Sequence, residues 1–188
     1  MRCYDEAYNN LAVIEGGYVN DKDDLGAETY RGISRKFHPN WEGWNIIDKY
    51  KKNALTKKQL NIELSQDEQL QELVKQFYYD NYWIKFNGDA LPCIIAEELL
   101  EQAVLLGTWK TAGENLQKAL NMLNKDGKLF PDLVVDGIVG PKTLDALSKI
   151  PTRLVLKVLN YLEFGRFAES INKRPTNEKF LWGWLNRV

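Results

Sequence analysis

A glutamate at the end of a predicted helix is the residue of this chain best suited to acid–base chemistry. Glu15 closes a helical pattern and directly precedes two glycines, Gly16 and Gly17. The C-terminal end of a helix carries partial negative charge and unsatisfied carbonyl groups, which favour the protonated form of a carboxyl group placed there. A carboxyl group that keeps its proton is suited to act as a general acid. We therefore identify Glu15 as the candidate proton donor.

The loop after Glu15 concentrates further carboxylates. Glycoside hydrolysis uses one protonated carboxyl group, which donates to the leaving oxygen, and a second group that activates water or stabilises the positively charged transition state. The same oxygens would also suit a calcium ion, although their spacing lacks the pattern of an EF-hand loop. A solvated turn without a chemical role is the third interpretation. The acidic residues of this loop are Asp21, Asp23, Asp24 and Glu28.

Other kinds of catalytic site find little support in the sequence. His38 is the single histidine, and it precedes a proline in a predicted turn. A zinc cluster or a histidine-dependent triad would need more such side chains. Cys3 and Cys93 stand far apart in the sequence, and two cysteines do not make a disulfide framework. We expect no bridge between them and interpret Cys93 as a small buried apolar residue.

Length and charge restrict the class of protein. The 188 residues suffice for one compact domain with its own core, or for one such domain with a small appendage. The net charge of −1 argues against a protein built to bind nucleic acid. Residues 1–108 hold 12 basic and 18 acidic side chains, whereas residues 109–188 hold 13 and 8. The basic half would suit an anionic polymer, or the two halves are solvated surfaces of opposite sign. No segment is apolar over the roughly 20 residues of a membrane span.

The elements that must position these residues are mostly helices, because apolar residues recur at helical spacing along most of the chain. Ser65 and Glu68 form a capping box before one such pattern. Pro92 and Pro151 stand where the start of a helix tolerates proline, and residues 136–141 form a turn that leads into a short helix. No strand pattern is convincing, so the sequence predicts an all-α or mainly α fold. Trp83, Trp182 and Trp184 are interpreted as core residues, and the lysine pairs at 51–52 and 57–58 as solvated helix faces.

Residues 15–33 read Glu-Gly-Gly-Tyr-x-Asn-Asp-x-x-Asp-x-Gly-x-x-Thr-x-x-Gly-Ile. This pattern resembles the opening signature of the glycoside hydrolase family 108 muramidases, which are lysozyme-like enzymes. The resemblance continues at Tyr82-Trp83, in the helix of residues 96–107, and in Leu-Gln-Lys-Ala-Leu-Asn at 116–121. Residues 136–147 look like the associated peptidoglycan-binding region, and Gly-Trp-Leu-Asn-Arg-Val at 183–188 is the family's usual ending. The resemblance covers nearly the whole chain.

The resemblance implies a lysozyme-like helical fold, with a catalytic region at 1–108 and a peptidoglycan-binding helical region at 109–188 packed on it. It assigns the role of catalytic acid to Glu15 and implies no metal and no organic cofactor. In phage-type lysozymes, eight residues separate the Glu from an Asp, and five more separate that Asp from a Thr. Eight residues also separate Glu15 from Asp24 here. By this analogy Asp24 and Thr29 position or polarise water, although four residues separate them here in place of five. Two departures from the family pattern are Ala27, in place of Gly, and Leu105, in place of Asn.

Substrate contacts are expected from the same segment. Aromatic faces pack against the apolar faces of pyranose rings, which makes Tyr18 and Tyr30 candidates for binding substrate. Asn20 belongs to the family pattern and is the third candidate.

The function implied by the resemblance is that of a peptidoglycan hydrolase, an N-acetylmuramidase that uses Glu15 as general acid. A lytic transglycosylase acting on the same bond is one alternative. A non-catalytic peptidoglycan-binding or secretion-accessory protein is the other. The N-terminal sequence MRCYDEAYNN contains no readable signal peptide. We therefore expect a protein made in the cytoplasm that reaches the cell wall with the help of a holin or a secretion machine, with peptidoglycan as its partner and neither nucleic acid nor a membrane span.

Overall fold

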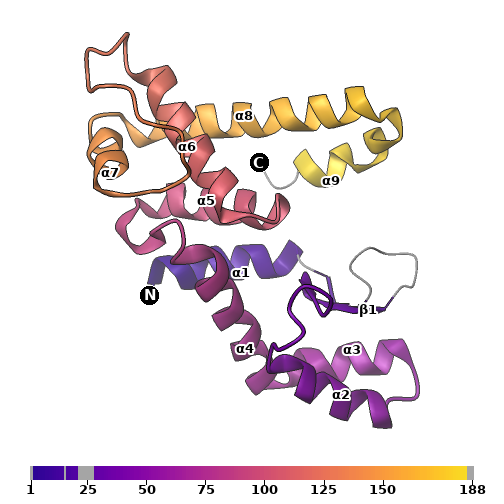
Figure 1. Ribbon diagram of the computed structural model, residues 1–188. Helices are drawn as coiled ribbons and strands as arrows, with labels where there is room; N and C mark the ends of the chain where they lie inside the picture. Colours follow the sequence, from indigo (N-terminus) through magenta and orange to yellow (C-terminus); the bar gives the residue numbers. More distant parts are fainter. Residues whose placement is uncertain (1, 15, 21–27, 186–188) are drawn as a thin grey trace. The chain divides into compact units, whose positions relative to one another are not determined.

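The computed structural model describes residues 2–14, 16–20 and 28–185 (Figure 1). By the contacts between residues, the chain divides into two compact units, Tyr8–Asp80 and a second one that joins Met1–Ala7 to Asn81–Val188. Helices make up most of both units, which confirms the mainly α fold class. The division differs from the boundary expected at Thr108, and the two regions 1–108 and 109–188 stay a prediction. Among the described residues, every helix is too short or too polar to cross a bilayer.

The unit Tyr8–Asp80 combines a small sheet with three helices that contact one another. Helix α1 (Arg2–Ile14) is divided between the two units, and its second half, from Tyr8 onward, belongs to this one. The helical pattern predicted ahead of Glu15 is confirmed in α1, where its apolar residues Tyr4, Tyr8 and Leu11 are buried. The other elements are β1 (Tyr18–Asn20), β2 (Glu28–Tyr30), β3 (Ile33–Ser34), α2 (Gly43–Asn53), α3 (Lys57–Gln66) and α4 (Glu68–Tyr78).

The sheet is an element that the sequence did not predict. Its strands lie in the order β1-β2-β3, and both neighbouring pairs are antiparallel. Arg31 and Gly32 join β2 to β3 with positive φ angles of 43° and 75°, as in the two-residue turns that match the twist of a hairpin. The hydroxyl of Tyr78 donates to the carbonyl oxygen of Arg31 at 2.7 Å and holds this turn. Strands of two or three residues are too short to show an alternating pattern.

Helix α4 does not begin at the predicted capping box. Helix α3 continues through Gln66, so Ser65 lies in its last turn and not ahead of a helix. Asp67 is the N-cap of α4 instead, and its Oδ1 accepts a hydrogen bond from the backbone N–H of Leu70 at 2.8 Å. The apolar pattern predicted after the capping box lies in α4, and four of its five members are buried while Leu73 is half-buried. The buried members are Leu70, Val74, Phe77 and Tyr78.

The second unit is centred on three helices, α5 (Cys93–Leu105), α6 (Trp109–Leu123) and α8 (Thr152–Lys173), which contact one another (Figure 1). Their shared core is apolar and almost completely buried. Leu99, Leu116, Leu120, Val155 and Leu159 belong to it. The remaining elements are η1 (Tyr79–Trp83), which spans the division between the units, η2 (Gly88–Ala90), α7 (Pro141–Ser148), η3 (Pro175–Phe180) and α9 (Leu181–Leu185).

The helices of this unit begin and end next to prolines and glycines, as local sequence signals predict. Pro92 and Pro151 immediately precede α5 and α8. Gly107 follows α5 with a φ of 68°, a conformation that glycine adopts without strain. The predicted turn at 136–141 leads into α7, which has Pro141 as its first residue. Backbone preferences of proline and glycine are local, and local signals are those that a sequence shows most directly.

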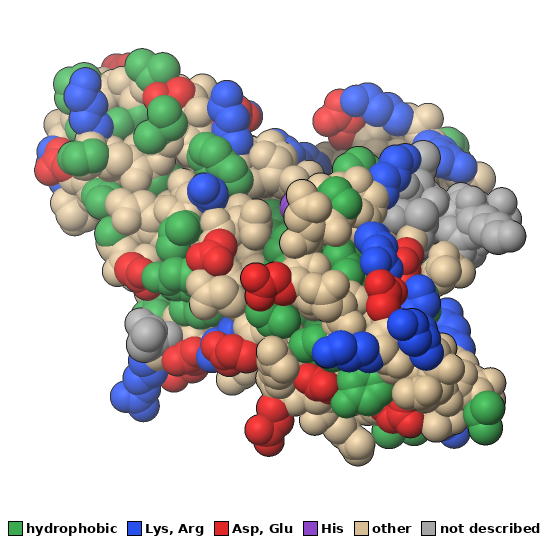
Figure 2. All heavy atoms as spheres, turned by 60° about the horizontal axis from the view of Figure 1, so that its bottom comes forward, with side chains coloured by type: hydrophobic (Ala, Val, Ile, Leu, Met, Phe, Trp, Pro, Cys, Tyr) green, Lys and Arg blue, Asp and Glu red, His purple; other side chains and the backbone are tan. Residues whose placement is uncertain are grey.

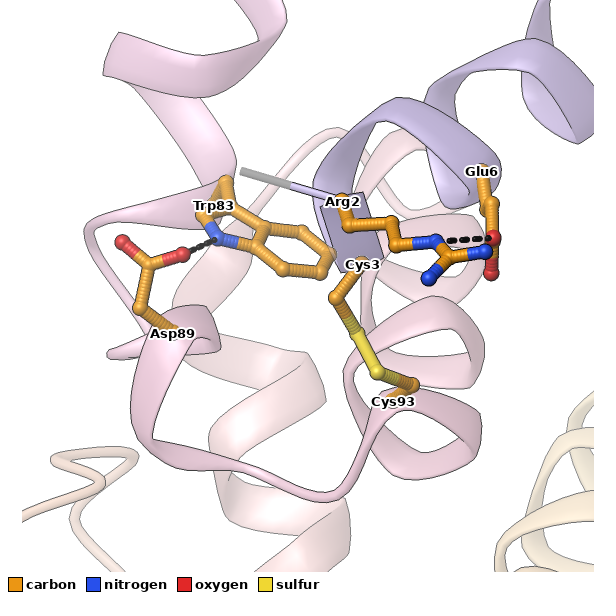
Figure 3. Close-up of a disulfide and its surroundings, with 6 residues drawn as sticks. All are labelled: Arg2, Cys3, Glu6, Trp83, Asp89 and Cys93. Carbon is orange, nitrogen blue, oxygen red and sulfur yellow. Dashed lines mark hydrogen bonds and ion pairs between the residues drawn. A yellow bond between two sulfur atoms is a disulfide. The ribbon is translucent and has the colours of Figure 1, made fainter.

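A disulfide joins Cys3 near the start of α1 to Cys93 at the start of α5 (Figure 3). The expectation of unpaired cysteines is therefore wrong, and Cys93 is exposed rather than buried. The two Cα atoms lie 5.4 Å apart although 90 residues separate them in sequence. Close to the bridge, Trp83 is completely buried as predicted, and its Nε1 donates to Oδ1 of Asp89 at 2.9 Å (Figure 3).

Two tryptophans near the C-terminus differ from the predicted core role. Trp182 is 83% exposed. Trp184 is half-buried and stacks on Phe167 with ring centroids 5.1 Å apart. Figure 2 shows hydrophobic side chains scattered among charged and polar ones on the face that it displays. An aromatic residue type therefore does not by itself predict that the side chain is buried.

Candidate functional site

The predicted site residues belong to the segment that runs from the end of α1 into the sheet. Glu15 and Asp24, the predicted acid and one of its predicted helpers, lie outside the described residues. Helix α1 ends at Ile14, the residue before Glu15, which agrees with the helix end expected there. The other predicted site residues lie on two adjacent strands. They are Tyr18 and Asn20 in β1, and Thr29 and Tyr30 in β2.

The pleat of the sheet separates Thr29 from Tyr30. Tyr30 pairs with Tyr18 across β1 and β2, whereas Thr29 pairs with Val19. Directly opposed residues share a face of a sheet, and neighbours along a strand point to opposite faces. Tyr18 and Tyr30 therefore share one face, where both are buried, and Thr29 shares the other with the exposed Val19. The structure does not bring Thr29 and Tyr30 together on one surface.

Tyr30 connects the sheet to α3 and α4. It is only 1% exposed. Its hydroxyl donates to the carbonyl oxygen of Leu64 at 3.2 Å and accepts from Nε2 of Gln71 at 3.0 Å. Hydrogen bonds of a buried hydroxyl stabilise the fold, because breaking them leaves polar groups without partners. A contact between Tyr30 and substrate stays a prediction, as it does for Tyr18 and for the exposed Asn20.

A close approach of α3 explains the second glycine of the Glu-Gly-Gly pattern. A Cβ atom on Gly17 would overlap the side-chain amide of Asn61, whereas a Cβ atom on Gly16 would meet open space. The Oδ1 atom of Asn61 accepts the backbone N–H of Tyr18 at 2.6 Å. Asn61 therefore fixes the start of β1 directly after the segment that holds Glu15. Sequence reasoning missed Asn61, since nothing near it in the sequence indicates this contact.

Glu28 lies in a cluster of charged side chains between β2 and α2. Its Oε1 accepts hydrogen bonds from Nζ of Lys51 at 2.6 Å and from the hydroxyl of Tyr18 at 2.9 Å. Its Oε2 accepts from Nη1 of Arg35 at 2.9 Å. Arg35 in turn forms a two-point ion pair with Asp48, at 2.8 and 2.7 Å. Lys51 was predicted to lie on a solvated helix face, and that prediction is wrong because its ammonium group is bound here.

Electrostatics keep this cluster ionised. Burial raises the pKa of Glu28, but the hydrogen bonds from Lys51, Arg35 and Tyr18 outweigh it and leave the pKa below its ordinary value. The hydrogen bonds from Arg35 lower the pKa of Asp48 in the same way. Glu28 is the first residue of β2, and in the sequence it follows the segment that contains Asp24. The cluster therefore ties the start of β2 to α2.

Replacing Glu28 by Gln is expected to lower stability at neutral pH and to have little effect in acid. A carboxylate with a lowered pKa in the folded state stabilises the fold above its unfolded pKa of about 4.3. That stabilisation disappears as the pH falls through the lower folded pKa. Urea unfolding of both proteins at pH 7 and near pH 3 measures the difference. The exposed Glu42, replaced by Gln, serves as the control. A deficit of equal size at both pH values would contradict the proposed ion pairs.

Within the described part of the chain, no group of three His, Cys, Asp or Glu side chains is arranged to hold a metal ion. The aspartates considered above as calcium ligands, Asp21, Asp23 and Asp24, lie outside that part.

Comparisons with known proteins match both parts of the chain. The model of a family described as glycosyl hydrolase 108 matches residues 8–107. A second model, described as a predicted peptidoglycan domain, matches residues 111–188. The solved structure of SagA from Brucella abortus is 26% identical with a TM-score of 0.63, and the match covers 98% of this chain and 88% of that chain. No curated protein matches the chain.

Proposed function

The chain belongs to the glycosyl hydrolase 108 family, and on this premise we propose that it cleaves the β-1,4 bond between N-acetylmuramic acid and N-acetylglucosamine. The two family matches together support a glycosidase that acts on peptidoglycan. The observation that carries the proposal is their combination in one chain, because a hydrolase region at 8–107 is followed by a peptidoglycan domain at 111–188. The enzyme would accordingly be a muramidase of the lysozyme type.

In the proposed reaction Glu15 donates its proton to the glycosidic oxygen while the bond from the anomeric carbon to that oxygen breaks. A water molecule adds to the anomeric carbon, and its proton restores the acid group. Asp24 and Thr29 position or polarise this water. Support comes from the spacing of these three residues and from the end of α1 at Ile14, the residue that precedes Glu15 in the sequence. A carboxyl group at that terminus is disposed to keep its proton.

Because Thr29 and Tyr30 lie on opposite faces of the sheet, we expect different effects from replacing them. Replacing Thr29 by Val, which keeps the shape and removes the hydroxyl, should lower kcat roughly tenfold or more with little change in stability. Replacing Tyr30 by Phe should lower the free energy of unfolding by about 1–2 kcal/mol and leave kcat nearly unchanged, because the hydroxyl is buried and bonds Leu64 and Gln71. Steady-state kinetics and urea unfolding separate the two effects. A Tyr30→Phe protein of normal stability and low kcat would place Tyr30 in contact with substrate instead.

Analysis of the released fragments tests the reaction itself. Purified peptidoglycan is digested with the full chain, and the products are identified by mass spectrometry. Reducing muramic acid ends are expected, because water is the acceptor in the proposed reaction. Anhydro-muramic ends would reassign the protein to the lytic transglycosylases. An absence of fragments together with binding to the wall would support a non-catalytic accessory protein.

Peptidoglycan lies outside the cytoplasmic membrane, so we also propose that a holin or a secretion machine brings the protein to its substrate. Cells that produce the chain alone should then lyse only after their membrane is permeabilised. If cells with an intact membrane lysed as fast as permeabilised cells, assisted export would be contradicted.

A further inference from the structure

A pocket of about 680 Å³ lies in the unit that joins Met1–Ala7 to Asn81–Val188, and all of its lining residues fall between Gln117 and Asp145. Its walls come from the irregular segment 130–140 and from residues 141–145 of α7, and Gln117 of α6 also lines it. Residues of this region match the peptidoglycan domain, but that match does not say which part of peptidoglycan is bound or where.

Three side-chain amides hold the wall of this pocket in place, two from α6 and one from the residue that caps its C-terminal end. Gln117, Asn121 and the C-cap residue Asn124 are four and three residues apart and therefore lie on one side of the helix. Asn121 bonds both backbone groups of Leu133, accepting its N–H at 2.8 Å and donating to its carbonyl oxygen at 2.9 Å. Asn124 donates to the carbonyl oxygen of Phe130 at 2.6 Å. The amides replace the backbone partners that a strand would provide to this irregular segment.

Gln117 and two glycines fix the next part of the wall. The Oε1 atom of Gln117 accepts the N–H groups of Asp136 and Gly137 at 2.9 and 2.8 Å. Gly137 has a φ of 79°, and a Cβ atom on Gly113 of α6 would overlap its carbonyl oxygen. The segment therefore approaches α6 more closely than larger residues would allow. Such a wall is preformed, so little ordering is needed when a ligand binds.

The charge of the pocket is opposite to that of the region around it. Residues 109–188 hold 13 basic and 8 acidic side chains. Three of these acids line the pocket, Asp132, Asp136 and Asp145, against the single basic residue Lys142. The rest of the lining is largely apolar and includes Val134 and Ile138, which are 77% and 62% exposed. An anionic pocket with apolar walls is suited to a cation on a short apolar stem.

Each of the three carboxylates is oriented by a hydrogen bond that a protein side chain donates to one of its two oxygens. The Oδ1 atom of Asp136 accepts from Nε2 of Gln117 at 2.8 Å, and this bond lowers the pKa of Asp136 below its ordinary value. The Oδ1 atom of Asp132 accepts from Nδ2 of Asn124 at 2.9 Å. The Oδ2 atom of Asp145 pairs with Nζ of Lys149 at 2.7 Å. The second oxygen of each carboxylate can accept a hydrogen bond from a ligand.

We propose that this pocket binds the free side-chain ammonium group of a diamino acid in the stem peptide of peptidoglycan. The ammonium group would bond the carboxylates, and the methylene groups that carry it would pack against the apolar walls. The choice of a stem peptide as the source of the amine rests on the proposed function. The pocket would then recognise peptide that is not crosslinked through this amine, while the segment around Glu15 acts on the glycan.

Titration calorimetry of the full chain with the tripeptide L-Ala-γ-D-Glu-L-Lys tests this proposal. The matched probe is the same tripeptide acetylated on its side-chain nitrogen, which removes the charge and keeps the stem. We expect acetylation to weaken binding roughly tenfold or more. Replacing Asp132 and Asp145 together by Asn should weaken binding of the free peptide by a similar factor. Asp126→Asn removes an exposed acid of the same region outside the pocket and should leave the affinity unchanged.

Equal affinity for the two peptides would overturn the proposal, as would no binding of the free peptide at millimolar concentration. If the double variant unfolds at a lower temperature than the parent, Asp145→Asn alone replaces it, because Asp145 is exposed on α7. Binding to an isolated peptide does not depend on glycan cleavage. Peptide binding without cleavage would therefore refute the proposed function and support the amine site. Cleavage without peptide binding would refute only the amine site.

Discussion

Replacing Glu15 by Gln is expected to lower the rate of peptidoglycan cleavage about 10²–10⁴-fold. The amide has nearly the shape of the carboxyl group, but it cannot donate a proton to the glycosidic oxygen. The leaving sugar would then depart as an alkoxide, which is far less stable than an alcohol. The rate at which reducing ends appear from purified peptidoglycan measures the effect, at equal protein concentration and at the pH of highest activity.

Asp23→Asn is the matched control for this experiment. It removes a carboxylate of the same sequence segment, at a position that the Glu-Gly-Gly-Tyr pattern leaves variable. Its activity should stay close to that of the parent. Thermal unfolding of both variants shows whether a lost rate reflects a lost fold. A Glu15→Gln protein that cleaves peptidoglycan at the parent rate would move the role of the acid to another residue.

Removing the Cys3–Cys93 bridge is expected to lower the free energy of unfolding by about 2–4 kcal/mol. The bridge closes a loop whose ends are 90 residues apart, so it restricts the unfolded chain much more than the folded one. Urea unfolding followed by tryptophan fluorescence compares the oxidised protein, the same protein with a reductant, and the Cys3→Ser, Cys93→Ser double variant. The reduced protein and the double variant should unfold at the same lower urea concentration.

The double variant also controls for side effects of the reductant, because it has no disulfide to reduce. A midpoint that the reductant leaves unchanged in the parent would contradict a stabilising bridge. Structural disulfides persist in oxidising compartments. The bridge is therefore in keeping with the proposed action on a wall outside the cytoplasm.

Most helices of this protein could be predicted from the sequence, because their signals are local. The apolar stripe of α4, the prolines before α5 and α8, and the glycine after α5 all lie within the elements or next to them. The one error at a helix start, Ser65 in place of Asp67, has a physical cause. Both are residues that can cap a helix, and the end of the preceding helix decides which of them is free to do so.

The residues of the candidate site could be predicted from the sequence, but their arrangement in space could be predicted only in part. The Glu-Gly-Gly pattern and the spacing to Thr29 are properties of the sequence. The sheet that places Thr29 opposite Val19 and Tyr30 opposite Tyr18 is not, since the register of paired strands is set by contacts between segments. The roles of Asn61 and Lys51 depend in the same way on contacts across 43 and 23 residues of sequence.

The sequence by itself determined the mainly α class, the positions of most helix ends and the family of the enzyme. Only the tertiary structure decided that Cys3 meets Cys93, that Glu28 is bound by Lys51 and Arg35, and that carboxylates of a basic region gather around one pocket. Helix propensity and capping act between residues a few positions apart, so they can be read along the chain. Disulfides, ion pairs and pockets depend on distances in space, which are fixed only when the core packs.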